Sequence, residues 1–195
     1  MRWENIKLFM RKEFDQPSSL EAEKAVLGGL LLKPDLWDTV SVTVDEKDFI
    51  LLEHQLIYRA IRRLRDHGSE IDTVTLIESL TSDPDISSLS NFNQNEYIRQ
   101  LAKDTPGTAN FDNYTDIVKQ TSNLRKLIST ASDISNIAKD SDTFEIEDTF
   151  SQAENKLINL RDSIDRKKGP TLAKDLIKPV YDNIEENINS KTPLI

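Results

Sequence analysis

The chain contains no glycine or proline between Thr108 and Lys168, and this long stretch limits what it can fold into more than any other feature. Glycine and proline most often end helices and shape turns, so their absence favours long helices. Apolar residues recur through the stretch at intervals of three and four, as on one face of a helix. A polar break at 139–143 divides it in two. We therefore predict an antiparallel hairpin of two long helices over 108–166.

The apolar stripes of this hairpin are candidates for contacts with other chains. At 1.5 Å per residue, helices of this length extend beyond what a small head can cover. Part of each stripe would then be left for a partner, although packing of the hairpin against its own head is the alternative. The residues that we expect to mediate self-association and partner binding are Leu124, Ile128, Ile134, Phe150, Leu157 and Leu160.

Residues 17–107 have the pattern of a globular head built from several short helices. No long run of alternating β-branched residues suggests a strand, so the predicted fold class is all-α. Helix starts are marked by capping residues and helix ends by Gly or Pro. The predicted helices run from Ser18, with Glu21 completing a capping box, to Leu32; from Pro34 through Val40; from Glu53 to Asp66; from Asp72 through Leu80; and from Asn93 to Lys103.

The two ends of the chain differ from its middle. Residues 1–16 form an N-terminal extension with Trp3 and Phe9 at near-helical spacing. A Lys-Lys-Gly-Pro linker at 167–170 precedes an amphipathic helix predicted over 171–190 and a tail at 191–195. The apolar stripe of that helix is cut off from the rest of the chain, so we expect it to dock on a partner. The docking residues are Leu172, Leu176, Val180 and Ile184.

Charge and composition exclude several classes of protein. The net charge is −9, and most of the acidic excess lies in 17–110, a surface that repels phosphate. Any contact with DNA should therefore be indirect. No apolar run is long enough to span a membrane, and no secretory signal is present. The chain has no cysteine, so a cytoplasmic location is expected.

We find no candidate catalytic, cofactor-binding or metal-binding residues in the sequence. A phosphate-binding P-loop is absent, and Gly28-Gly29 lies within an apolar helix, where close helix packing is the preferred interpretation. The two histidines, His54 and His67, lack the spacing of metal ligands, and His54 is interpreted as structural or exposed. A basic cluster over 59–65 is either a solvated helix face or a contact for an acidic partner.

Several ordered segments of the chain are similar to one known family. They are Pro17 to Gly29, Asp48-Phe49, His54 to Tyr58, Gly68 to Leu76, Tyr97-Ile98 and Thr105 to Asn110, followed by Leu124 to Ile128 and Tyr181 to Glu185. Together they resemble the N-terminal domain and linker helix of the bacterial and phage replicative DNA helicases of the DnaB family. The resemblance covers roughly 17–190.

The resemblance implies a function for each part. In this family the helical head and hairpin form a collar, hairpins pair into dimers, and three dimers form a hexameric ring. The ring recruits the C-terminal domain of primase, and the linker helix docks on the neighbouring ATPase domain; a helicase loader is a further expected partner. ATP and Mg²⁺ are expected in an ATPase domain outside this sequence, which would unwind DNA 5′ to 3′. The alternative is a stand-alone, motorless adaptor or inhibitor of a host helicase or primase.

Overall fold

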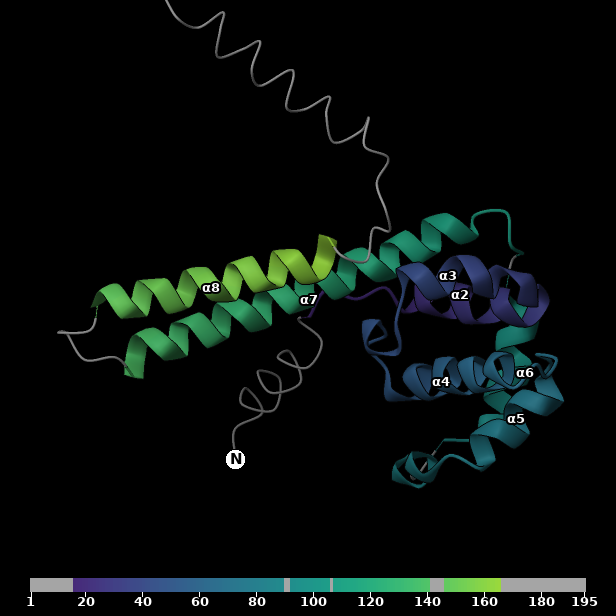
Figure 1. Cartoon of the computed structure of the whole chain (residues 1–195). Helices are drawn as coiled ribbons and strands as arrows, with labels where there is room; N and C mark the ends of the chain where they lie inside the picture. The colour runs from purple at the N-terminus through teal and green to yellow at the C-terminus, as the bar shows by residue number, and fades with distance from the viewer. Residues whose placement is uncertain (1–15, 90–91, 106, 141–145, 166–195) are drawn as a thin grey trace, which may run out of the picture.

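The computed structural model describes residues 16–89, 92–105, 107–140 and 146–165, and every regular element within them is helical (Figure 1). The predicted all-α class is confirmed. The α-helices are α2 (Leu20–Leu32), α3 (Trp37–Thr43), α4 (Leu52–Asp66), α5 (Thr73–Thr81), α6 (Gln94–Asp104), α7 (Phe111–Asp140) and α8 (Ile146–Asp165). Short 3₁₀ turns are η1 (Pro34–Leu36), η2 (Glu46–Asp48) and η3 (Pro84–Ser88).

The capping residues explain where several helices begin. Asp72 caps α5 by accepting hydrogen bonds from the backbone N–H groups of Val74 and Thr75 at 2.7 and 2.9 Å, as the sequence predicts. Asn93 likewise caps α6. The predicted cap of α2 is wrong by one residue, because the side chain of Ser19 rather than Ser18 accepts a hydrogen bond from the backbone N–H of Ala22, the third residue of the helix.

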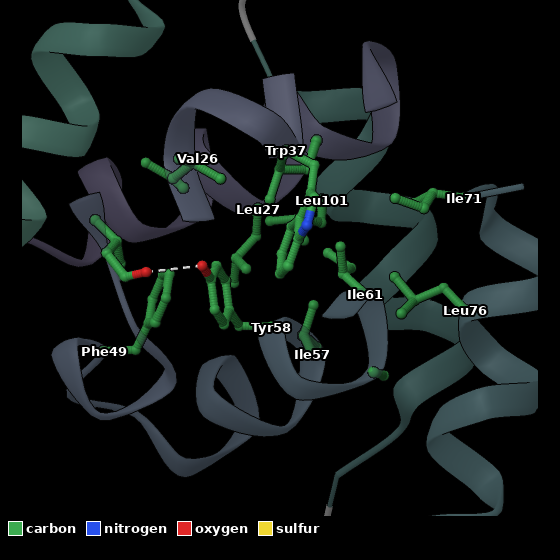
Figure 2. Close-up of a cluster of buried hydrophobic side chains, with 14 of the residues drawn as sticks. Val26, Leu27, Trp37, Phe49, Ile57, Tyr58, Ile61, Ile71, Leu76 and Leu101 are labelled. Carbon is green, nitrogen blue, oxygen red and sulfur yellow. Dashed lines mark hydrogen bonds between the residues drawn. The ribbon is translucent and has the colours of Figure 1, made fainter. Parts of the chain in front are cut away.

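The core of the head is built largely from α2 and α4, with further buried residues from α3, α5, α6 and α7. Three aromatic rings pack together in this core, where the ring centroid of Tyr58 lies 5.1 Å from those of Trp37 and Phe49, with both ring pairs tilted (Figure 2). The Tyr58 hydroxyl donates to the carbonyl of Val44 at 2.8 Å, so this buried polar group keeps a partner. Burial raises the pKa of Tyr58 to about 12, which keeps the hydroxyl protonated at neutral pH.

Two glycines allow α2 to approach its neighbours closely, as predicted. A Cβ added at Gly28 would lie 1.8 Å from the Thr105 hydroxyl and 2.9 Å from the Leu101 carbonyl oxygen. A Cβ added at Gly29 would lie 2.7 Å from the Phe111 ring. Neither position therefore has room for a side chain, and α2 contacts α6 and α7 through its backbone.

Gly28→Ala is expected to destabilise the head. Alanine gains about 1 kcal/mol of helix propensity over glycine, but overpacking costs about 1–3 kcal/mol, since the backbone carbonyl of Leu101 cannot rotate away. Urea unfolding followed by circular dichroism measures the balance. A stabilised variant would show that the helix contact at Gly28 is looser than this structure has it.

The first turns of α7 belong to the head, and the rest of this 30-residue helix projects from it. Phe111 and Val118 are buried in the core of the head, just beyond the boundary predicted at 107. Farther along, α8 returns antiparallel beside α7, so the two helices form the projecting hairpin (Figure 1). Both helices agree with the prediction from spacing, with α8 beginning at Ile146 after the polar break.

Candidate interface on the helical hairpin

The hairpin has an inner seam, where its two helices meet. In the described part of the chain, α8 is the element that packs along the outer half of α7. The half-buried apolar residues in this region are Ile134 and Ile137 of α7, and Ala153, Leu160 and Ile164 of α8. Ile134 and Leu160, both predicted to bind a partner, therefore lie at the contact between the helices of the same hairpin.

The other predicted hairpin residues are exposed. Leu124 and Ile128 are each 49% exposed, Leu157 is 47% exposed and Phe150 is 64% exposed. Leu127, between the first two, is exposed as well. A side chain of this size gains about 1.5–3 kcal/mol when it is fully buried. We name the five residues Leu124, Leu127, Ile128, Phe150 and Leu157 the hairpin face.

The hairpin face lies on one side of the hairpin. Lys156 of α8 and Asp133 of α7 form an ion pair at 3.0 Å that marks the opposite side. At about 100° per residue, Leu124 lies about 180° around α7 from Asp133. By the same rule, Phe150 lies about 120° around α8 from Lys156. Leu124 and Phe150 therefore lie on the same side of the hairpin, away from this ion pair.

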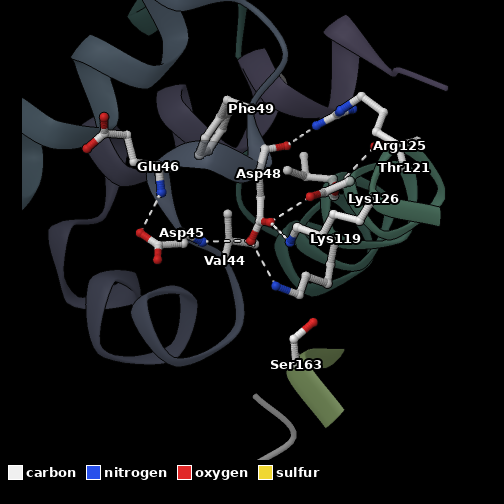
Figure 3. Close-up of polar contacts among 12 residues, drawn as sticks. Val44, Asp45, Glu46, Asp48, Phe49, Lys119, Thr121, Arg125, Lys126 and Ser163 are labelled. Atoms are coloured by element: carbon white, nitrogen blue, oxygen red, sulfur yellow. Dashed lines mark hydrogen bonds and ion pairs between the residues drawn. The ribbon is translucent and has the colours of Figure 1, made fainter. Parts of the chain in front are cut away.

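A buried carboxylate joins the head to the hairpin. Asp48, at the end of η2, accepts hydrogen bonds from Lys119 at 2.8 Å, Ser122 at 2.6 Å and Lys126 at 2.6 Å, all three from α7 (Figure 3). The backbone N–H of Asp45 is a fourth donor, at 2.9 Å. Two of these four donors reach each carboxylate oxygen.

These donors control the charge of Asp48. Burial alone would raise the pKa of this carboxyl, but the two lysines, Ser122 and the Asp45 N–H together lower it well below its usual range. The Asp48 carboxylate is thus ionised at neutral pH and holds both ammonium groups.

Arg125 strengthens the same junction from the next position on α7. Its guanidinium donates to the backbone carbonyl of Asp48 and, at 2.8 Å, to that of Pro17. Burial lowers the pKa of Arg125. This network was missed from the sequence, although Lys119, Ser122 and Lys126 have the i, i+3, i+7 spacing of residues on one helix face.

A second buried polar network crosses the head. His54 Nδ1 is hydrogen-bonded to Glu23 Oε2 and His54 Nε2 to the Tyr97 hydroxyl, each at 2.6 Å. The other Glu23 oxygen accepts the backbone N–H of Ile50 at 2.9 Å. The network links α2, α4 and α6. His54 is therefore structural, which is one of the two roles expected for it, and burial raises the pKa of Tyr97 to about 12.

The arginines of α4 pair with acids of the same head. Arg59 bonds Glu46 and Asp85 at 2.7 Å each. Further pairs are Arg59 with Asp83, Arg62 with Asp45, Arg63 with Asp83, and Arg65 with Asp38. The basic cluster thus supports the fold internally, and an acidic partner is not required to neutralise it.

The described residues lack two features that would point to other kinds of protein. They contain no group of three or more His, Asp or Glu side chains placed to hold a metal ion. None of their helices is long and apolar enough to cross a membrane. The predicted docking residues Leu172, Leu176, Val180 and Ile184 lie outside the described residues.

Comparison with known proteins identifies the family. The family model "DnaB-like helicase N terminal domain" matches residues 15–120, more than half of the chain. The chain belongs to this family. It is 34% identical over 187 residues to the replicative DNA helicase DnaB of Buchnera aphidicola subsp. Baizongia pistaciae, covering 95% of this chain and 40% of that helicase. It is 33% identical to the replicative DNA helicase DnaC of Bacillus subtilis, covering 90% of this chain and 37% of that helicase.

Solved structures of the DnaB family agree with the fold. The crystal structure of the N-terminal domain of DnaB helicase from Mycobacterium tuberculosis superposes with a TM-score of 0.65 at 26% identity, covering 74% of this chain and 99% of that domain. A structure of a DnaB-like replicative helicase and its interactions with primase gives a TM-score of 0.58 at 20% identity, covering 91% of this chain and 36% of that one. The chain thus spans about two fifths of the full-length helicases that it matches.

Proposed function

We propose that this chain is the collar and linker region of a hexameric replicative DNA helicase and mediates ring assembly and primase docking at the replication fork. The hairpin face is the observation that carries the proposal, because it exposes five large apolar residues on one side of two helices. Exposed apolar surface of this kind marks contacts between proteins. Membership of the DnaB family supports a second copy of the chain, and then primase, as the occupants.

The proposal assigns a role to each part of the chain. The head (17–107) and hairpin (108–166) form the collar, and a connection at 167–170 leads to a linker helix at 171–190. That helix docks on a neighbouring ATPase domain through Leu172, Leu176, Val180 and Ile184. A helicase loader is a further partner, and DNA is contacted only indirectly. A protein that acts at the bacterial replication fork is located in the cytoplasm.

The residues of this chain that the structure describes do not form a site for ATP or Mg²⁺. The sequence has no P-loop, and the described residues offer no cluster of acids for a metal ion. We assign the 5′-to-3′ unwinding driven by ATP to an ATPase domain of the full-length protein. The relatives are long enough to contain such a domain, since this chain covers only 40% of the Buchnera helicase.

Self-association tests the proposal directly. Light scattering over a concentration series should show dimers and larger species, and Phe150→Asp should shift the chain toward monomer. A charge on the hairpin face would have to be buried in the interface, which costs several kcal/mol. Because Phe150 is exposed within one chain, the variant should keep its helicity.

Asn155→Asp is the matched control, since it places the same charge at an exposed position of α8 outside the hairpin face. It should associate like the unmodified chain. A chain that stays monomeric at high concentration, or equal effects of the two substitutions, would refute assembly through this surface.

A further inference from the structure

The direction of the hairpin depends on how one continuous helix is held by the head. Because α7 runs without a break from the core of the head into the hairpin, it acts as a lever. Its buried anchors, Phe111 and Val118, lie in the first turns. The hydrogen bonds to Asp48 lie farther out, over the eight residues from Lys119 to Lys126.

The outer end of the lever amplifies small movements at this junction. From Lys126 to Asp140, α7 extends about 21 Å, and a tilt of about 15° at Lys126 would move its end by about 5 Å. Along its outer half, α7 packs against α8, which moves with it (Figure 1). The outermost bonds between α7 and the head therefore control the position of the hairpin face.

We infer that Asp48 is a positioning residue that fixes the direction in which the hairpin leaves the head and so presents the hairpin face ready for a second copy. Three side chains of α7 converge on this one carboxylate, and Arg125 binds the Asp48 carbonyl beside it. Charge-assisted bonds from two successive turns resist both tilt and rotation of the helix. A prepositioned surface lowers the ordering cost of association. The last step rests on the proposed self-association, whereas the fixed direction does not.

Spin labels can measure the direction of the hairpin within one chain. The sequence has no cysteine, so Val42→Cys on α3 and Ser151→Cys on α8 give unique labelling sites, both exposed. Labelled chain diluted into excess unlabelled chain reports the head-to-hairpin distance by pulsed electron paramagnetic resonance. With Asp48, we expect one narrow distance distribution. With Asp48→Asn, it should broaden or shift by about 5 Å, the movement that a tilt of about 15° produces, at unchanged helicity.

Two further variants make the result decisive. Asp85→Asn also removes a carboxylate from an ion pair of the head, that with Arg59, but does not touch α7, and it should leave the distances unchanged. Lys126→Met removes one donor, while Asp48 keeps the other three. If Asp48→Asn does not fold, a broader distance distribution in Lys126→Met supports the inference, although the broadening should be smaller. Unchanged distances in Asp48→Asn, or in Lys126→Met where only that variant folds, would overturn the inference.

Light scattering of the same proteins separates this inference from the proposed function. If the unmodified chain associates and the Asp48 variant keeps its distances, the positioning role fails and assembly stands. If the unmodified chain never associates but the distances respond to Asp48, the positioning role stands and the proposed function fails.

Discussion

Glu23→Ala is expected to lower the free energy of unfolding by several kcal/mol, because each hydrogen-bonding group left without its partner inside the protein costs about 1–3 kcal/mol. Glu23 is completely buried and accepts hydrogen bonds from the Ile50 backbone and from His54. Its loss would leave both groups without this acceptor in the interior. It would also loosen Tyr97, which is bonded to the other nitrogen of the same imidazole. Urea or thermal unfolding at neutral pH measures the effect.

Glu21→Ala is the matched control on the same helix. Its side chain is 89% exposed and forms one ion pair with Lys24 at 3.6 Å. Exposed pairs of this kind contribute about 0–1 kcal/mol, so the control should unfold almost like the unmodified chain. Similar losses from the two substitutions would mean that the network of Glu23, His54 and Tyr97 does not stabilise the head.

The helices could be predicted from sequence because their signals are local. The periodic stripe and the absence of Gly and Pro define α7 and α8, and Asp72 marks the start of α5 through bonds to residues two and three positions away. The start of α2 was missed because Ser18 and Ser19 are adjacent and either can cap.

The site was less predictable because it depends on contacts between distant residues. Asp48 is bonded to residues that lie 71 to 78 positions later in the chain, and no local sequence pattern predicts a contact over that separation. The hairpin stripe shows the same limit. Ile134 and Phe150 satisfy the same periodicity, yet the first lies in the seam and the second on the exposed side, because the path of α8 decides which part of the stripe is covered.

Asp48→Asn is expected to remove a stabilisation that itself depends on pH. The folded state lowers the pKa of Asp48 well below the unfolded value of about 3.9, so the ionised carboxylate favours folding. This contribution is complete above the unfolded pKa and is lost as the pH falls toward the folded pKa. The unmodified chain should therefore exceed the variant in unfolding free energy by a constant amount, roughly 3 kcal/mol, from pH 7 to 5.

Below pH 4, the difference between the two proteins should shrink by up to about 1.4 kcal/mol per pH unit, because only the unmodified chain must then bind a proton at Asp48 on unfolding. Urea titrations of both proteins between pH 3 and 7 measure this difference, in which the contributions of all other carboxylates cancel. Asp85→Asn should show at most about 1 kcal/mol at pH 7, since its ion pair with Arg59 is exposed. A difference for Asp48 that stays constant down to pH 3 would mean that folding does not favour the ionised carboxylate, so that its charge does not join α7 to the head. Because asparagine has nearly the shape of aspartate, the remaining difference would then come from the hydrogen bonds that the lost carboxylate oxygen accepts.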